Sequence, residues 1–377
     1  MNFELTEERK MLQDGLRRFL RETYTPALRA ELVEADCGFS RDVWSGLAEM
    51  GVIGALFSED DGGFAGGGFD ISLVFEELGR VGAVDPLLDT AVLGGGLIAA
   101  LGNEVQKQQI ESVIAGTTQL AFAHAEPSSR YDMSQVESTA TRDGDGYVLN
   151  GRKAVVVNAP AADHILISAR TDGQAADRNG ISLFLVPAGI DGIALRSYPL
   201  VSGGQAAEIL LEDVRLGAAA RLGPEGGAYD AIAEVNARAT LAICAEALGL
   251  MESIRELTTD YLKTRKQFGK PIGKFQALQH RMADVLIEIE QARSAVINLA
   301  GHLDSAADTR EMHVSATKNL IGNAAKLVAE ESIQMHGGIG MTEEYELGHL
   351  AKRLIMVDHR FGDAIHHLER FVALAVA

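Results

Sequence analysis

The sequence predicts an α+β multidomain protein in which an N-terminal helical domain and a C-terminal four-helix bundle flank a central antiparallel β domain. Helical periodicity runs through roughly the first 115 residues. Short apolar or alternating runs, bounded by Gly, Asp, Asn or Pro, then predict a β sandwich or barrel. Four long helical patterns follow Gly223. We therefore expect domains at residues 1–116, 117–225 and 226–377.

The composition is that of an ordinary folded chain. Of 377 residues, 47% are apolar and 23% are charged, and the net charge of −19 argues against nucleic acid as a partner. Only Cys37 and Cys244 are present, so neither a disulfide framework nor a zinc site is indicated. An acidic N-terminus without a long apolar run predicts no signal peptide and no membrane span. A soluble, cytoplasmic protein is expected.

The N-terminal region carries clear helix signals. Thr6, followed by Glu7 and Glu8, is typical of an N-cap with acids in the first helical turn. The Gly-rich segment 59–68 lacks the strand-then-helix context of a phosphate loop, so we interpret it as a turn. Further helical patterns cover residues 43–50, 71–78, 86–101 and 104–115.

Strand character is confined to the central region, and no helical patterns alternate with the strands, which excludes a Rossmann unit. The strand-like runs are residues 119–124, 146–151, 154–157, 164–168, 181–186 and 208–211. The four C-terminal helices are expected at about 229–264, 276–303, 307–335 and 344–376. Helices of this length predict an oligomer that packs through the bundle.

The connection from Tyr261 to Asp284 gathers cations in an otherwise acidic chain. It could be a solvated helix connection whose Lys and Arg complement a helix C-terminus. The alternative, which periodicity alone favours less, is an anion site, in which the Arg265 guanidinium holds a phosphate with the Phe268 ring beside it. Both interpretations stay open on periodicity alone.

Together these residues resemble the acyl-CoA dehydrogenase family over nearly the whole chain. The likeness is strongest in residues 264–272 (TRKQFGKPI) and 334–342 (QMHGGIGMT), and residues 147–153 add to it. The resemblance implies FAD bound between the β domain and the C-terminal bundle, usually in a homotetramer. It also implies an acyl-CoA substrate that loses hydrogens from Cα and Cβ, and an electron acceptor such as electron-transfer flavoprotein.

On the ADP side of the flavin, the resemblance implies two groups of cofactor-binding residues. The first is Arg265, Gln267 and Phe268. The second is Gln334, Gly337 and Gly338, from a loop that a neighbouring subunit supplies in the family. An Arg fork suits phosphate, and glycine lets the backbone approach a nucleotide closely. His336 is interpreted as orienting this loop.

The base that removes the α-proton is not in its expected place. The resemblance places this carboxylate at Gly362, or in some members at Ala239, and neither residue carries one. Asp363 is the nearest substitute, one residue further on. It is either the catalytic base or the N-cap of the final helix.

The segments expected beside the flavin ring also depart from the family. Ala125 stands where the family has Thr, and residues 153–158 (KAVVVN) stand where it has Lys-x-Trp-Ile-Thr-Asn. Two hydroxyls and one indole are therefore absent, and each lost hydrogen bond weakens binding by about 1 kcal/mol. We expect the ADP site to be better retained than the ring site.

Three functional hypotheses follow. The chain is an FAD-dependent acyl-CoA dehydrogenase that uses Asp363 or an unidentified base. Alternatively, it is the non-catalytic partner in a heteromer resembling the pimeloyl-CoA and steroid side-chain dehydrogenases, which pair two unlike subunits. A weaker hypothesis keeps the fold with different flavin chemistry, as in nitroalkane-oxidising or monooxygenase relatives.

One further residue is a candidate for substrate binding. Arg238 lies near the family's CoA-proximal Arg, whose position falls on Thr240, and it either reaches the CoA nucleotide or forms a surface salt bridge. His366 and His367 are adjacent rather than one turn apart, so they make a poor metal pair and no metal site is expected.

Overall fold

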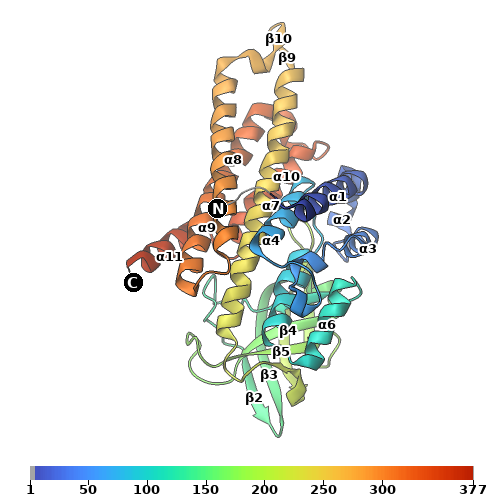
Figure 1. The fold of residues 1–377 in the computed structure, drawn as a ribbon, viewed down its shortest axis with the longest axis vertical. Coiled ribbons are helices and arrows are strands. Elements are labelled where there is room, and N and C mark those ends of the chain that lie inside the picture. The colour runs from blue at the N-terminus through green and yellow to red at the C-terminus, as the bar shows by residue number, and fades with distance from the viewer. Residues whose placement is uncertain (1–4, 377) are drawn as a thin grey trace. The chain divides into compact units, whose positions relative to one another are not determined.

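The computed structural model describes residues 5–376, which form two compact units (Figure 1). The first, here called the helical unit, comprises residues 5–29, 67–83 and 240–376. The second, here called the sheet unit, comprises residues 30–66 and 84–239. In chain order, N-terminal helices, a central sheet and C-terminal helices follow one another, which confirms the predicted fold class.

The N-terminal helices form largely where the periodicity predicts them. Thr6 caps the first helix, because its side chain accepts a hydrogen bond from the Arg9 amide at 3.3 Å. Residues 88–95 form a π-helix within the pattern predicted for 86–101, and α2 was not predicted. The elements are α1 (Glu7–Thr23), α2 (Pro26–Glu34), α3 (Arg41–Glu49), α4 (Gly68–Arg80), the π-helix (Leu88–Gly95), α5 (Gly96–Leu101) and α6 (Glu104–Ile114).

The Gly-rich segment 59–68 is a turn, as predicted. It begins with a short 3-10 helix (Glu59–Asp61) and then folds back on the residues before it. The Gly63 amide donates to the Ser58 carbonyl at 2.8 Å, and the Gly66 amide donates to the Ala55 carbonyl at 2.9 Å. Its backbone groups are thus occupied internally and do not form a phosphate cradle.

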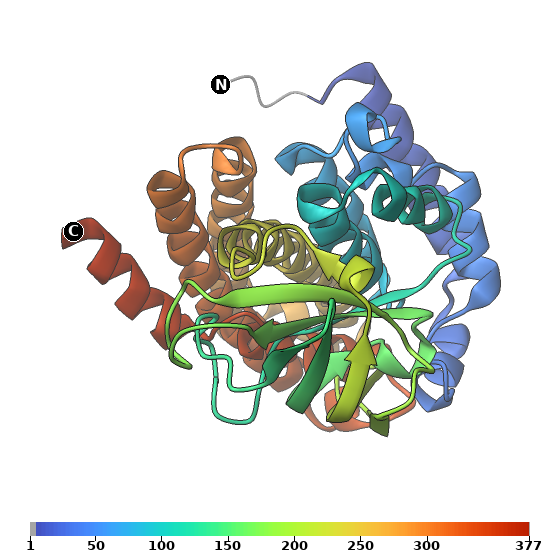
Figure 2. The same ribbon diagram turned by 90° about the horizontal axis from the view of Figure 1, so that it is seen from below.

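The central sheet is antiparallel except where β4 pairs in parallel with β1 and with β2. The π-helix packs against β1, and most strands of the sheet are the green arrows in Figures 1 and 2. Three strands of this sheet, β2, β6 and β8, were not predicted. Most residues of β2 and β6 are exposed and lack apolar alternation, and β8 has only two residues. The strands are β1 (Leu120–Ala123), β2 (Thr139–Asp143), β3 (Gly146–Val157), β4 (His164–Arg170), β5 (Ile181–Pro187), β6 (Ile193–Pro199), β7 (Gln205–Leu216) and β8 (Arg221–Leu222).

The first three C-terminal helices match the prediction: α7 (Tyr229–Thr264), α8 (Gln276–His302) and α9 (Ala307–His336). The fourth pattern, expected as one helix over 344–376, is wrong as a continuous helix. It divides into α10 (Glu346–Met356), a 3-10 turn (Val357–His359) and α11 (Ala364–Val376). The break follows from backbone conformation, because Phe361 and Gly362 have φ of 61° and 110°, which a right-handed helix cannot contain.

Close glycine contacts hold α4 against α7 within the helical unit. A Cβ added at Gly79 would lie 2.1 Å from the Glu246 carbonyl oxygen, and one added at Gly249 would lie 2.0 Å from that of Glu76. The helices can approach this closely only because neither position carries a side chain. None of the helices described between residues 5 and 376 is long and apolar enough to cross a membrane.

Candidate active site

The basic connection between α7 and α8 is a small hairpin at the end of the helical unit. Its strands are β9 (Lys266–Gln267) and β10 (Lys270–Pro271), and the Ile272 amide closes it by donating to the Arg265 carbonyl at 2.8 Å. Arg265 and Gln267 are exposed. Phe268, at the tip, has φ of 52° and an exposed fraction of 89%. The hairpin therefore offers a cation and an aromatic ring to a ligand or a partner chain.

The glycine loop that follows α9 is also open. Gln334, Gly337 and Gly338 are exposed, and a Cβ added at either glycine would meet no atom within 4 Å. The loop continues as a 3-10 helix over Gly337–Met341. Backbone and ligand can therefore come into contact here without steric obstruction.

His336 ties this loop to the hairpin. Its ring stacks on Tyr261 of α7, with centroids 4.4 Å apart, and the Tyr261 carbonyl accepts from the Arg265 amide at 2.8 Å. The Nδ1 atom contacts the Ser332 carbonyl at 2.8 Å, and Nε2 lies 3.2 Å from the Tyr345 hydroxyl. Burial lowers the pKa of His336, which favours the neutral ring. The structure thus brings the two predicted groups of ADP-side residues to the same end of one unit.

The ring-side segments of the sheet unit are joined by a buried ion pair that the sequence did not reveal. Lys153 Nζ lies 2.7 Å from Glu126 Oε1 and 3.1 Å from Ser168 Oγ, and it also donates to the His124 carbonyl at 3.2 Å. Burial lowers the pKa of Lys153 to about 8, although Glu126 opposes this shift. Burial raises the pKa of Glu126, but the Lys153 charge and the hydrogen bonds from Lys153, Glu137 and Ser138 together outweigh burial and keep this pKa below its ordinary value.

The side chains at the positions expected beside the flavin ring are apolar. Ala125 is exposed, and Val155, with φ of 52°, has an exposed fraction of 54% at a bulge in β3. Asn158 is buried with φ of 64°, and its Nδ2 donates to the Leu120 carbonyl at 3.0 Å. The side chains at 125, 155 and 157 therefore offer no hydroxyl to a flavin ring.

A side chain at Gly362, where the family resemblance places the catalytic base, would meet two histidine rings. A Cβ added at Gly362 would lie 2.6 Å from His366 Cδ2 and 2.7 Å from His367 Nε2. Asp363 caps α11, because its Oδ1 accepts from the His366 amide at 2.8 Å and its carbonyl accepts from the His367 amide at 3.0 Å. Ala239 is fully buried.

Arg238 is engaged within the sheet unit. Its Nη1 donates to the Gly66 carbonyl at 2.7 Å, so this Arg holds the end of the Gly-rich turn. In the part of the chain that the structure describes, no group of three or more His, Cys, Asp or Glu side chains could hold a metal ion.

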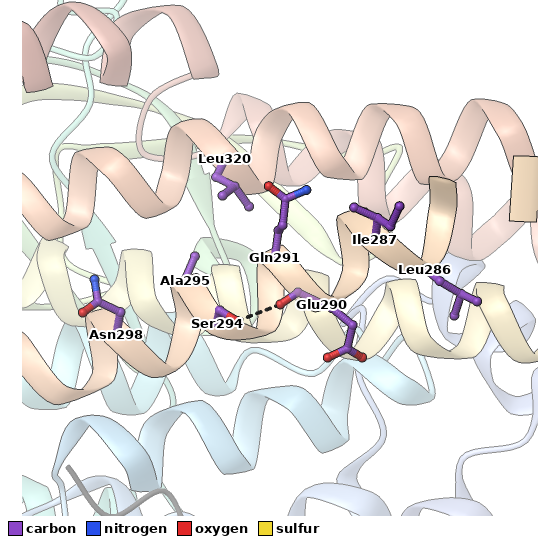
Figure 3. Close-up of a pocket in the computed structure, with 8 residues that line it drawn as sticks. All are labelled: Leu286, Ile287, Glu290, Gln291, Ser294, Ala295, Asn298 and Leu320. Carbon is purple, nitrogen blue, oxygen red and sulfur yellow. Dashed lines mark hydrogen bonds between the residues drawn. The ribbon is translucent and has the colours of Figure 1, made fainter. Parts of the chain in front are cut away.

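A groove of about 730 Å³ lies along α8 and α9 (Figure 3). The only ionisable side chain on it is Glu290, and the Ser294 hydroxyl donates back to the Glu290 carbonyl at 2.9 Å. None of the predicted site residues lines it, so this groove is not the candidate active site. Its lining is Leu286, Ile287, Glu290, Gln291, Ser294, Ala295, Asn298 and Leu320.

Comparison with known proteins shows that the chain has the fold of a flavin-dependent oxidoreductase. Models of the N-terminal, middle and C-terminal domains of acyl-CoA dehydrogenase match residues 6–116, 121–214 and 227–358. The chain therefore belongs to the acyl-CoA dehydrogenase family, whose cofactor is FAD.

Similar proteins cover the chain almost completely. A probable acyl-CoA dehydrogenase of Bacillus subtilis, YngJ, is 31% identical over 99% of this chain and 98% of its own. Butyryl-CoA dehydrogenase from Megasphaera elsdenii is 26% identical with a TM-score of 0.91, covering 100% of both chains. The ChsE4–ChsE5 complex of Mycobacterium tuberculosis matches at 27% identity and a TM-score of 0.89, over 100% of this chain and 99% of the other.

Proposed function

We propose that this chain is the subunit of a heteromeric FAD-dependent acyl-CoA dehydrogenase that helps to bind the ADP part of the flavin and does not supply the catalytic base. One observation carries the second half of this proposal. Gly362 has φ of 110°, and a side chain built on it would overlap His366 and His367. The nearest carboxylate, Asp363, is engaged in capping α11.

The ADP site is proposed from the exposed end of the helical unit. Arg265 would pair with the diphosphate, and Phe268 would pack against the nucleotide. Gln334 offers an amide, and the open backbone at Gly337 and Gly338 accepts close approach. These groups fit an anionic, planar ligand. When bound, FAD supplies the acceptor for the β-hydride of the acyl thioester.

A second acyl-CoA dehydrogenase-like chain is the proposed partner. Its role is to supply the base and the polar groups that the ring-side surface at 125, 155 and 157 lacks. The similarity to the ChsE4–ChsE5 complex, an assembly of two differently named chains, supports this composition.

We further propose electron-transfer flavoprotein as the electron acceptor. A cytoplasmic location is proposed because the free thiols of Cys37 and Cys244 suit a reducing compartment.

The test is to purify the chain alone and together with a dehydrogenase-like chain encoded beside it. Flavin absorbance should show little FAD in the chain alone and stoichiometric FAD in the complex. An acyl-CoA panel should bleach the flavin only in the complex. A homotetramer of this chain that holds full FAD and turns over acyl-CoA would overturn the proposal.

One observation keeps a second function in view, an active dehydrogenase with Asp363 as its base. Asp363 is half-buried. Its Oδ1 accepts the hydrogen bond from the His366 amide, and within residues 5–376 no hydrogen bond to its other carboxylate oxygen, Oδ2, is described. The substitution Asp363→Asn keeps a cap and removes the base. Loss of bleaching in this variant of a complex that bleaches would favour the second function.

A further inference from the structure

One face of α9 holds the segment that joins α10 to α11. Ser315, Lys318, Asn319 and Gly322 are spaced i, i+3, i+4 and i+7, so they lie on the same side of the helix. We call these four residues the α9 seat. All of them contact the segment between residues 358 and 367, and all belong to the helical unit.

Lys318 is the centre of the α9 seat. Its side chain is fully buried, and Nζ donates to the Gly362 carbonyl at 2.6 Å and to the Asp358 carbonyl at 3.2 Å. Burial lowers the pKa of Lys318, while Cys244, Asp358 and Asp363 oppose this shift. A buried ammonium persists only where oriented acceptors replace its water, and the two carbonyls do so here.

The rest of the α9 seat completes the attachment. Asn319 Nδ2 donates to the Ala364 carbonyl at 2.7 Å, and Ser315 Oγ lies 3.4 Å from His367 Nδ1. A Cβ added at Gly322 would lie 2.1 Å from Asp358 Oδ1, which itself accepts from the Ala364 amide at 2.9 Å. The segment is therefore fixed at both of its ends.

The held backbone is strained. Phe361, which is not glycine, has φ of 61°, and its carbonyl contacts His367 Nε2 at 2.9 Å. Such conformations persist only where the surrounding contacts over-determine them. The α9 seat provides those contacts.

We propose that Lys318 is a positioning residue that holds the backbone of residues 358–364 in its observed conformation. In this conformation Asp363 caps α11 and is not available as a catalytic base. The consequence for catalysis rests on the proposed function, but the effect of Lys318 on the conformation of residues 358–364 is a property of this chain. It can be measured without FAD and without a partner.

The first experiment is hydrogen–deuterium exchange of the purified chain. In Lys318→Met, amides between residues 360 and 367 should exchange at least tenfold faster, whereas those of α8 should not change. Lys326→Met, at an exposed position on the same helix, is the matched control and should match the unchanged chain. Equal exchange in the two variants would overturn the proposal. If Lys318→Met does not fold, Asn319→Ala removes the bond to the Ala364 carbonyl and should give a smaller acceleration at the same amides.

A second experiment measures the energetic coupling between Lys318 and Gly362. Gly362→Ala should lower Tm less in the Lys318→Met background than in the Lys326→Met background, because the released segment can move away from the clash. Additive Tm shifts would contradict the proposed role of Lys318.

A third experiment follows hydrogen exchange as a function of pH. In the unchanged chain, the protection of residues 360–367 relative to α8 should decline as the pH rises toward 10.5, because a neutral amine is a weaker hydrogen-bond donor than an ammonium. In Lys318→Met, this relative protection should not change with pH. Relative protection that does not change with pH in the unchanged chain would contradict a role for the Lys318 ammonium as the donor.

A failed proposed function would show itself differently. Full flavin and turnover in the chain alone would remove the heteromer and leave the exchange results intact. Unchanged exchange in Lys318→Met would remove the proposed role of Lys318 and leave the flavin measurements intact.

Discussion

Lys153 Nζ and Glu126 Oε1 lie 2.7 Å apart inside the sheet unit, and both side chains are almost wholly buried. The pair connects the two segments that the family resemblance assigns to the flavin ring. Ala154 adds a second link, because its amide donates to the Ala125 carbonyl at 2.8 Å. The relative position of the two segments is therefore set by the sheet itself, before any cofactor binds.

Breaking this pair should destabilise the chain strongly. Lys153→Met leaves the Glu126 carboxylate buried without its cation, and we expect a loss of about 3–5 kcal/mol in the free energy of unfolding. Lys107→Met breaks a partly exposed pair with Asp61 and should cost less than about 1 kcal/mol. Urea unfolding of the two variants makes the comparison. Equal losses of unfolding free energy in the two variants would show that the buried pair stabilises the chain no more than the partly exposed pair does.

Acid should weaken the helical unit through His367. Burial lowers the pKa of His367 to about 3, from an ordinary value of 6.5. The unfolded chain binds this proton first, so the contribution of His367 is complete above pH 6.5 and is lost as pH falls toward 3, by about 1.4 kcal/mol per pH unit. His367→Gln should flatten the acid limb of a Tm-against-pH curve. His359→Gln, at an exposed position, should leave that limb unchanged.

The role of Asp363 as a cap gives a stability prediction of its own. Asp363→Ala should cost about 1 kcal/mol, because the His366 amide loses its acceptor, while Asp363→Asn should cost little. In the complex with its partner, neither variant should change the rate of flavin bleaching by acyl-CoA. A loss of bleaching specific to Asp363→Asn would assign Asp363 as the base.

Restoring a glutamate at the family's base position should fail. Gly362→Glu forces a side chain into His366 and His367 and requires φ of 110° from a residue that rarely adopts it, so we expect a loss of about 2 kcal/mol or more. Calorimetry reports the stability, and acyl-CoA bleaching reports the chemistry. New bleaching in this variant would mean that the segment is mobile enough to present the carboxylate.

Arg265→Ala should reduce FAD retention in the complex by about tenfold to a hundredfold, as expected for the loss of a hydrogen-bonded charge. Stability without flavin should not change, because Arg265 is exposed. Lys263→Ala, two residues earlier and also exposed, is the control for a general loss of positive charge. Equal retention in both variants would remove Arg265 from the proposed diphosphate site.

The features predicted well were those with long or strong patterns. The bounds of α7, α8 and α9 follow directly from apolar periodicity, and the Thr6 cap follows from local chemistry. The break at Phe361 and Gly362 could not be predicted from periodicity, because apolar residues on both sides keep the same spacing. Backbone conformation there depends on Lys318, which lies on another helix.

Buried charges were the main omission in the candidate site. Lys153 follows Arg152, and Lys318 lies between Thr317 and Asn319, so the neighbouring residues equally suit a side chain that points to solvent. Only the three-dimensional arrangement supplies their partners, Glu126 in one case and two backbone carbonyls in the other.

The hairpin closed by Arg265 and Ile272 has a kinetic consequence. Its tip is already folded, with the Phe268 backbone held at φ of 52°, so a nucleotide that binds there orders few additional backbone torsions. Little conformational entropy is lost on association. Substitutions at this tip should therefore change chiefly how long a nucleotide stays bound, and much less how fast it arrives.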